Sequence, residues 1–216
     1  MVRRGWVRNH VNRQVSRIRQ IFKWAVSEEL INASILHALQ AVTALRPGRG
    51  DGAKESEPVR PIANEIVDAT LKHLPAMAGD MVRVQRLTGM RAGELCRMRG
   101  IDLDTTGKVW TYKPAAHKTA HHGHIRTIYI GPRGQMILQK YLRPTVDEFL
   151  FQPAESELKR RQMQHAERVT PDNQGNRPGT NKVRRRQRPP GERYDVAAYR
   201  RAIARACSLS PARAHA

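Results

Sequence analysis

The sequence predicts a mainly α-helical fold with one small antiparallel β-sheet, an α+β protein. Apolar residues recur every three to four positions over most of the chain, which indicates amphipathic helices. Residues 101–131 instead hold short runs rich in β-branched and aromatic residues, separated by turn residues. A stretch rich in Gly, Pro and charge at 46–60 reads as a linker. We therefore expect a helical unit over 1–45 and a larger unit over 61–216.

Two helices are predicted before the linker. Over 9–28, apolar residues form one stripe, and the other face holds Arg13, Arg17, Arg19 and Lys23. Phe22 and Trp24 are expected in the core. The stripe consists of Val11, Val15, Ile18, Phe22, Ala25 and Val26.

The second of these helices is expected over about 33–45, capped by Asn32 or Ser34. Two helices with one apolar face each make a small core. We therefore expect this unit to be incomplete at its N-terminus.

The larger unit is predicted to begin with three helices. The first, capped by Asn64, runs to about residue 74, and Pro75 restarts the chain into a helix that ends at Leu87. Thr88-Gly89 breaks it, and the third helix covers 91–98. Three short strands then follow, at 109–112, 115–118 and 126–130, and fit an antiparallel sheet.

Three further helices are expected after the sheet, with a basic segment before the last. The segment 169–193 is rich in Pro, Gly, Asn and Arg and is expected to be disordered in isolation. Asp195 caps the last helix, whose apolar face includes Tyr199. The other two helices are expected over 132–142 and 155–168.

The charge of the chain indicates a polyanionic partner. Its formal net charge is +20, from 39 Lys and Arg against 19 Asp and Glu. Nucleic acid is the leading candidate, because basic side chains that neutralise phosphates release counterions. The sequence has no long apolar run and no signal-like start, so we expect no membrane insertion or secretion. Cys96 and Cys207 are expected to be buried thiols in a reducing compartment, the cytoplasm.

Arg91, Glu94 and Lys118 form the candidate catalytic set. Arg91 follows the Gly89 turn, which allows a DNA backbone to approach, and a guanidinium can donate two hydrogen bonds to one phosphoryl group. Glu94 is a supporting residue that could orient Arg91, orient the turn or lie in solvent. Lys118, on a predicted hairpin, is a candidate general acid for a leaving hydroxyl, and Lys113 is its competitor.

The order of these features resembles the catalytic domain of the tyrosine recombinases, the phage-integrase family. The resemblance rests on Leu-Thr-Gly-Met-Arg-Ala-Gly-Glu-Leu at 87–95, Ala-His-Lys-Thr at 116–119 and Ile-Arg-Thr-Ile-Tyr-Ile-Gly at 125–131. It implies that 1–45 is part of a core-binding domain that clamps DNA. It also implies that 61–216 is the first half of a catalytic domain, with a basic insertion at about 169–193.

The resemblance further implies site-specific DNA integration and recombination through a 3′-phosphotyrosyl intermediate. Double-stranded DNA is the expected partner, with like protomers in a tetrameric synapse. No cofactor, metal, membrane or small-molecule substrate is expected, and the protein is expected on the nucleoid when bound. Contacts to DNA are expected from Arg13, Arg17, Lys23, His117 and Arg126.

The family's His-x-x-Arg cluster and nucleophilic Tyr are expected beyond this chain. His165 and Arg168 match the spacing but lie on a polar segment, and Tyr199 is expected in the core. We therefore expect a truncated recombinase fragment that is inactive alone. A non-catalytic DNA-binding remnant that competes with a full-length relative, or an unrelated RNA-binding protein, are the alternatives.

Overall fold

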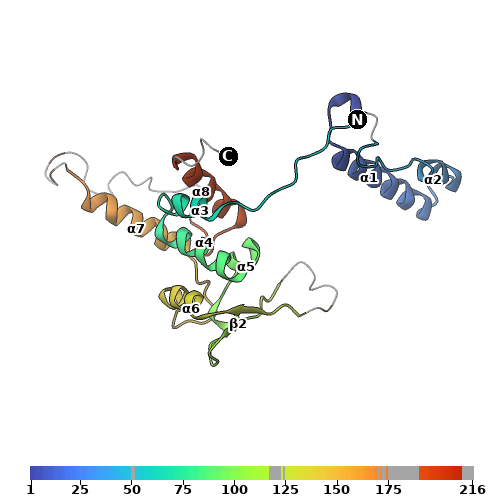
Figure 1. The fold of residues 1–216 in the computed structure, drawn as a ribbon. Coiled ribbons are helices and arrows are strands. Elements are labelled where there is room, and N and C mark those ends of the chain that lie inside the picture. The colour runs from blue at the N-terminus through green and yellow to red at the C-terminus, as the bar shows by residue number, and fades with distance from the viewer. Residues whose placement is uncertain are drawn as a thin grey trace. The chain divides into compact units, whose positions relative to one another are not determined.

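The chain folds into two compact units, Met1–Pro61 and Ile62–Ala216. The fold is α+β as predicted: helices dominate, and the second unit holds a three-stranded antiparallel sheet (Figure 1). Among the described helices, none is long and apolar enough to cross a membrane. The computed structural model describes residues 1–49, 52–116, 123, 125–169, 171, 174 and 190–210.

The first unit contains α1, Arg8–Ser27, and α2, Ala33–Gln40, after a short 3₁₀ turn at Val2–Arg4. Helix α1 confirms the expected helix over 9–28. The predicted cap of α2 is confirmed for Asn32, whose side chain accepts a hydrogen bond from the Ser34 backbone N–H at 2.9 Å.

Helix α2 ends at Gln40, five residues before the predicted end. The Arg19 guanidinium, on α1, donates hydrogen bonds to the carbonyls of Leu39, at 3.0 Å, and of Val42. These contacts satisfy carbonyl groups that a longer helix would have bonded internally. Hydrogen bonds from Arg19 on α1 therefore take the place of helical hydrogen bonds where α2 ends.

Helix α1 buries less of its surface than the sequence predicts. Val11 is buried, but Trp24 is 58% exposed and Ile21 is 62% exposed. The prediction that Trp24 lies in the core is wrong. Position 24 is two residues from Phe22, which corresponds to a rotation of about 200° around the helix axis. It therefore lies away from the apolar stripe.

Part of the expected linker packs on the start of α1. The Asn12 side-chain amide exchanges two hydrogen bonds of 2.9 Å with the backbone of Leu45. The Arg8 backbone N–H donates to the Lys54 carbonyl at 2.8 Å, and the Arg8 guanidinium lies 2.6 Å from the Glu55 carboxylate. Residues 54 and 55 thus belong to the first unit by contact as well as by position.

The helices of the second unit appear in the predicted order, and most end earlier than predicted. Short 3₁₀ turns follow α5 and α6, at Gly100–Asp102 and Gln139–Tyr141. Ala63, rather than Asn64, is the N-cap of the first helix. The helices are α3 Asn64–Leu71, α4 Ala76–Thr88, α5 Ala92–Cys96, α6 Pro132–Leu138, α7 Pro153–Ala166 and α8 Val196–Leu209.

The sheet has the order β1-β2-β3, with β1 at Leu103–Asp104, β2 at Trp110–Tyr112 and β3 at Ile128–Ile130. Trp110 pairs with Ile130, and Tyr112 pairs with both Ile128 and Leu103. Two of the three predicted strands are confirmed. Residues 115 and 116 of the predicted middle strand are not in the sheet, and residues 117 and 118 lie outside the described part. Pro114 lies directly before this predicted strand, and it has no N–H to donate to a neighbouring strand.

The core of the second unit lies between α4, the sheet and α8. Helix α4 contributes Met81 and Val84, and both are fully buried. Tyr199 on α8 is buried as predicted, and its hydroxyl lies 3.0 Å from the Gln85 side-chain oxygen. Other large buried side chains of this cluster are Leu95, Met98, Tyr112, Ile130, Leu138, Leu150 and Phe151.

Candidate phosphate-binding site

The turn between α4 and α5 presents Arg91 at the surface. Gly89 ends α4 in the left-handed conformation, at φ 64°, and its N–H donates to the Gln85 carbonyl at 2.8 Å. Met90 is buried and anchors the turn in the core. Arg91 follows as the N-cap of α5 with an extended backbone. Its side chain leaves a rigid turn and is 52% exposed.

Glu94, on α5, holds Arg91 from the protein side. Its side chain is only 3% exposed. The carboxylate accepts hydrogen bonds from the Arg91 backbone N–H at 2.8 Å and from Arg91 Nη1 at 3.0 Å. The first bond satisfies an unpaired N–H at the helix start, as in a capping box. Of the three positions open to Glu94 from the sequence, the structure shows contact with both Arg91 and its turn.

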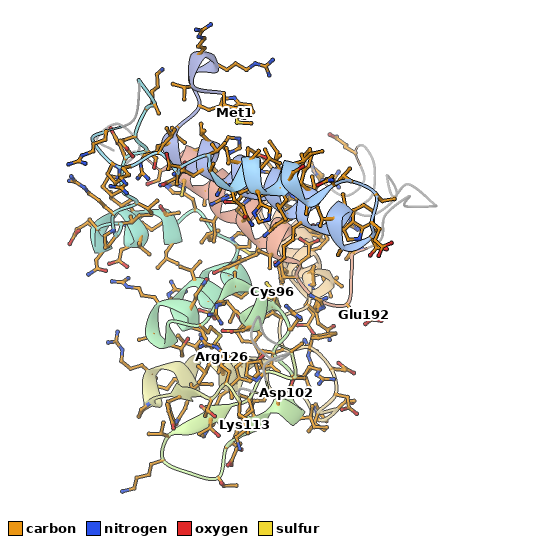
Figure 2. All side chains as sticks on the ribbon, turned by 90° about the vertical axis from the view of Figure 1, so that its right-hand side faces the viewer. Met1, Cys96, Asp102, Lys113, Arg126 and Glu192 are labelled. Atoms are coloured by element: carbon orange, nitrogen blue, oxygen red, sulfur yellow. The ribbon has the colours of Figure 1, made fainter. Side chains whose placement is uncertain are left out.

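Arg126 approaches the same carboxylate from the segment before β3. Its Nε lies 2.7 Å from Glu94 Oε1. The N–H direction does not meet the geometry of a hydrogen bond, and this buried Nε has no hydrogen-bond acceptor in the described part of the chain. We therefore treat the contact as an ion pair. Figure 2 shows Arg126 in the same region of the second unit as Cys96 at the end of α5.

Glu94 is ionised in this environment. Burial alone would raise the pKa of the carboxyl group, but the Arg91 N–H and the guanidinium groups of Arg126 and Arg91 outweigh it and lower the pKa. One carboxylate thus faces two permanent cations. The group carries a net positive charge, and the exposed part of Arg91 keeps N–H donors free for an anion.

Tyr112 fixes α5 against the sheet. Its hydroxyl donates to the Glu94 carbonyl at 2.8 Å, and burial raises the pKa of the phenol. Tyr112 also pairs with Ile128, two residues after Arg126. The same side chain therefore connects the helix that carries Glu94 to the strand that positions Arg126.

Searches of family models, curated proteins and solved structures find no match to this chain. The geometry of the site is therefore the basis for any assignment of function. This geometry suits a phosphoryl group, because planar guanidinium groups present several donors to its oxygens.

The structure brings together three of the predicted site residues: Arg91, Glu94 and Arg126. Lys118 and His117 lie outside the described residues. Arg13, Arg17 and Lys23 are exposed on α1, in the other unit. We did not foresee the pairing of Arg126 with Glu94. The sequence shows Arg126 as a single basic residue at the start of a β-prone run, and this position does not indicate which acidic residue it contacts.

The phenols of the chain are mostly inaccessible. Tyr129 is exposed on β3, whereas the other four are buried. Burial raises the pKa of these four phenols. A phenol with a raised pKa is a weaker source of nucleophilic phenolate at neutral pH. The buried tyrosines are Tyr112, Tyr141, Tyr194 and Tyr199.

The thiols differ from each other. Cys96 is buried, and burial raises the pKa of its thiol to about 11. Cys207 is exposed, so the prediction that both are buried is wrong for Cys207. Its neighbour Ala206 occupies the buried position on α8 instead. In the described part of the chain, no group of His, Cys, Asp and Glu could hold a metal ion.

Proposed function

We propose that this chain binds the backbone of duplex DNA and that Arg91 contacts a phosphate directly. In this proposal the chain is part of a site-specific recombinase of the tyrosine type. The observation that carries the proposal is the half-exposed Arg91 guanidinium, held by the buried carboxylate of Glu94 at 3.0 Å. A guanidinium fixed before the ligand arrives loses less conformational freedom on binding.

The two arginines have different parts in the proposed complex. Arg91 donates to the phosphate oxygens, because its outer N–H groups face solvent. Arg126 is more enclosed, with 32% of its side chain exposed, and it adds positive charge behind the contact. The net positive charge of the chain, +20, increases the rate and strength of the encounter with DNA at low salt.

We expect residues 1–216 to bind DNA and not to cleave a strand alone. Cleavage through a phosphotyrosyl link needs a reactive phenol, and Tyr129 is the only exposed one among the described tyrosines. Its position on β3, between the buried Ile128 and Ile130, directs it to the face of the sheet away from the core. Lys118 remains the proposed general acid of such a recombinase.

Fluorescence anisotropy with labelled nucleic acid tests the binding proposal. Duplex DNA is compared with a structured RNA hairpin for the wild type, Arg91→Ala and Arg201→Ala. Arg201 is an exposed cation on α8, so its variant has the same charge change. We expect a preference for duplex DNA, a roughly tenfold loss for Arg91→Ala, and a salt dependence reduced by about one charge for that variant.

Equal losses for the two variants, or a preference for RNA, would contradict the proposal.

A second assay addresses cleavage. The purified chain is incubated with nicked duplex DNA and separated under denaturing conditions, with Tyr129→Phe as the control. We expect no covalent adduct, and an adduct lost in Tyr129→Phe would show that the chain cleaves DNA by itself.

A further inference from the structure

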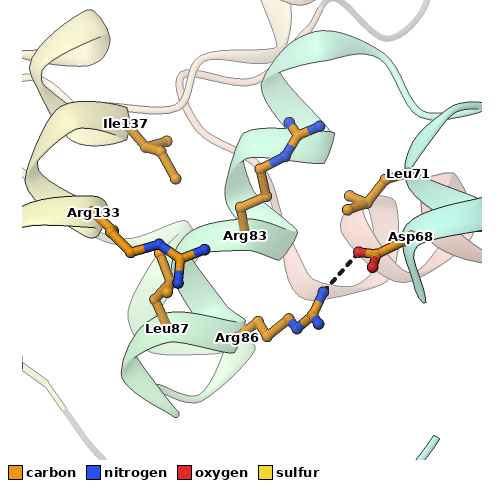
Figure 3. Close-up of a pocket in the computed structure, with 7 residues that line it drawn as sticks. All are labelled: Asp68, Leu71, Arg83, Arg86, Leu87, Arg133 and Ile137. Atoms are coloured by element: carbon orange, nitrogen blue, oxygen red, sulfur yellow. Dashed lines mark hydrogen bonds and ion pairs between the residues drawn. The ribbon is translucent and has the colours of Figure 1, made fainter. Parts of the chain in front are cut away.

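A basic pocket lies between α3, α4 and α6, apart from the Arg91 site. Its volume is about 440 Å³, and Figure 3 shows three guanidinium groups beside apolar side chains around it. The lining residues are Asp68, Leu71, Arg83, Arg86, Leu87, Arg133 and Ile137. We call this hollow the arginine pocket.

The positive charge of the arginine pocket is only partly neutralised within the chain. Arg86 lies 2.8 Å from Asp68, and Arg83 lies 2.9 Å from the buried carboxylate of Asp80. Arg133 makes no ion pair within the described ranges. Arg133 is therefore the one guanidinium group of the lining that makes no ion pair with a described carboxylate, and its charge favours an anionic ligand.

The walls of the pocket indicate a ligand that is apolar as well as acidic. Leu87 is 41% exposed at its edge, and Leu71 and Ile137 are half-buried beside it. A phosphate backbone gains little from contact with aliphatic side chains. A protein segment with carboxylates next to a Leu or Ile satisfies both features of the lining.

The end of α1 is a segment of this kind. Glu28, Glu29 and Leu30 are all exposed, and Leu30 is 64% exposed. Neither glutamate makes an ion pair in the part of the chain that the structure describes. We call residues 28–30 the acidic tip.

The backbone of the acidic tip holds Glu29 in an unfavourable conformation. Glu29 has φ 55° and is the one non-glycine residue with positive φ among those described. The N–H groups of Glu29 and Leu30 donate to Val26 and Ala25 at 3.1 and 2.9 Å, which is a Schellman ending. Glycine usually occupies this position, because a side chain there is strained. A strained residue that persists suggests a use for its side chain.

The sequence contains one other pair of adjacent acidic residues, Asp147 and Glu148. It does not suit the pocket. Glu148 already pairs with Arg143 at 3.7 Å, and the nearby Leu150 is 1% exposed. Of these two pairs, the acidic tip is the one that combines an exposed Leu with two carboxylates that make no ion pair in the described part of the chain.

We propose that the arginine pocket of one copy of this chain binds the acidic tip of a second copy. The two glutamates meet the guanidinium groups, and Leu30 contacts Leu87 and Ile137. The contact joins different surfaces, so it is a head-to-tail association. Because the acidic tip is three residues long, we expect the contact to bury little surface and the association to be weak, so that it is seen at high protein concentration. It does not depend on the proposed DNA binding.

Two complementary variants test this proposal by sedimentation velocity. The tip variant carries Glu28→Arg and Glu29→Arg, and the pocket variant carries Arg86→Glu and Arg133→Glu. We expect the wild type to associate and each variant alone to stay monomeric. An equimolar mixture should form species of two or more chains, because one intact tip and one intact pocket remain and the reversed tip and the reversed pocket are also opposite in charge. The variants change charge by equal and opposite amounts, so general repulsion does not explain this recovery.

A third variant separates docking from folding. Glu29→Gly relieves the backbone strain at the end of α1, so we expect a higher melting temperature. It also removes a carboxylate, so we expect about tenfold weaker association. Circular dichroism establishes that all variants are folded.

Three results would overturn the proposal. One is a wild type that stays monomeric, and another is a mixture that does not recover a two-chain species. The third is a pocket variant that associates normally but binds duplex DNA as weakly as Arg91→Ala. That last result would make the arginine pocket a phosphate site.

Discussion

The Glu94 carboxylate lies 2.7 Å from Nε of Arg126 and so connects α5 to the segment before β3. The same carboxylate bonds the backbone and side chain of Arg91. One buried anion thereby sets the positions of two cations that arise from separate parts of the second unit.

Replacement of Glu94 by Gln should destabilise the second unit by about 1.5–3 kcal/mol. The amide keeps the shape of the side chain but leaves two arginines without their anion. Urea denaturation measures the change. Glu157→Gln is the control, because Glu157 also pairs with two arginines, Arg160 and Arg161, but on a helix surface. We expect a loss below about 1 kcal/mol there, and equal losses would contradict the buried role of Glu94.

The stabilisation by Glu94 should depend on pH. Its pKa in the folded state is below the ordinary value of 4.5. The unfolded chain therefore binds a proton before the folded chain does, and acidification favours unfolding. The stabilisation is fully present above the unfolded pKa and is lost as pH falls through the folded pKa. Denaturation at a series of pH values should show wild type and Glu94→Gln converging below pH about 4; a constant difference would oppose this.

Tyr112→Phe should destabilise the second unit by about 1 kcal/mol. The variant removes the hydroxyl that donates to the Glu94 carbonyl at 2.8 Å, and the carbonyl then keeps the bond from the Arg97 N–H at 3.2 Å. Thermal or urea unfolding measures the change. Tyr129→Phe is the matched control, because the Tyr129 side chain is exposed, and it should be close to neutral. A larger effect for the control would place the important hydroxyl on β3 instead.

Trp24→Ser should change the stability of the first unit by no more than about 0.5 kcal/mol. The side chain is exposed, so its truncation leaves no cavity. Val11→Ala is the contrasting variant, because Val11 is buried, and removal of two methyl groups should cost about 1.5 kcal/mol. Circular dichroism follows both. A larger loss for Trp24→Ser than for Val11→Ala would mean that Trp24 is covered in solution.

The predictions from sequence succeeded where local patterns act. The helix over 9–28, the Asn32 cap and the helix break at Gly89 each depend on a few neighbouring residues, and the structure shows all three. They failed where distant segments decide. Leu103–Asp104 forms the first strand because it pairs with β2, and local sequence does not reveal that pairing. Residues 115 and 116 of the predicted middle strand are not in the sheet.

The helical character of the chain, the Gly turn before Arg91 and the excess of positive charge can all be read from the sequence alone. These features follow from side-chain spacing, backbone freedom and composition, which are local or additive properties. The tertiary structure decided that Glu94 is buried and that Arg126 reaches it. Burial and ion pairing depend on which segments pack together, and that choice arises from the summed contacts of the whole unit.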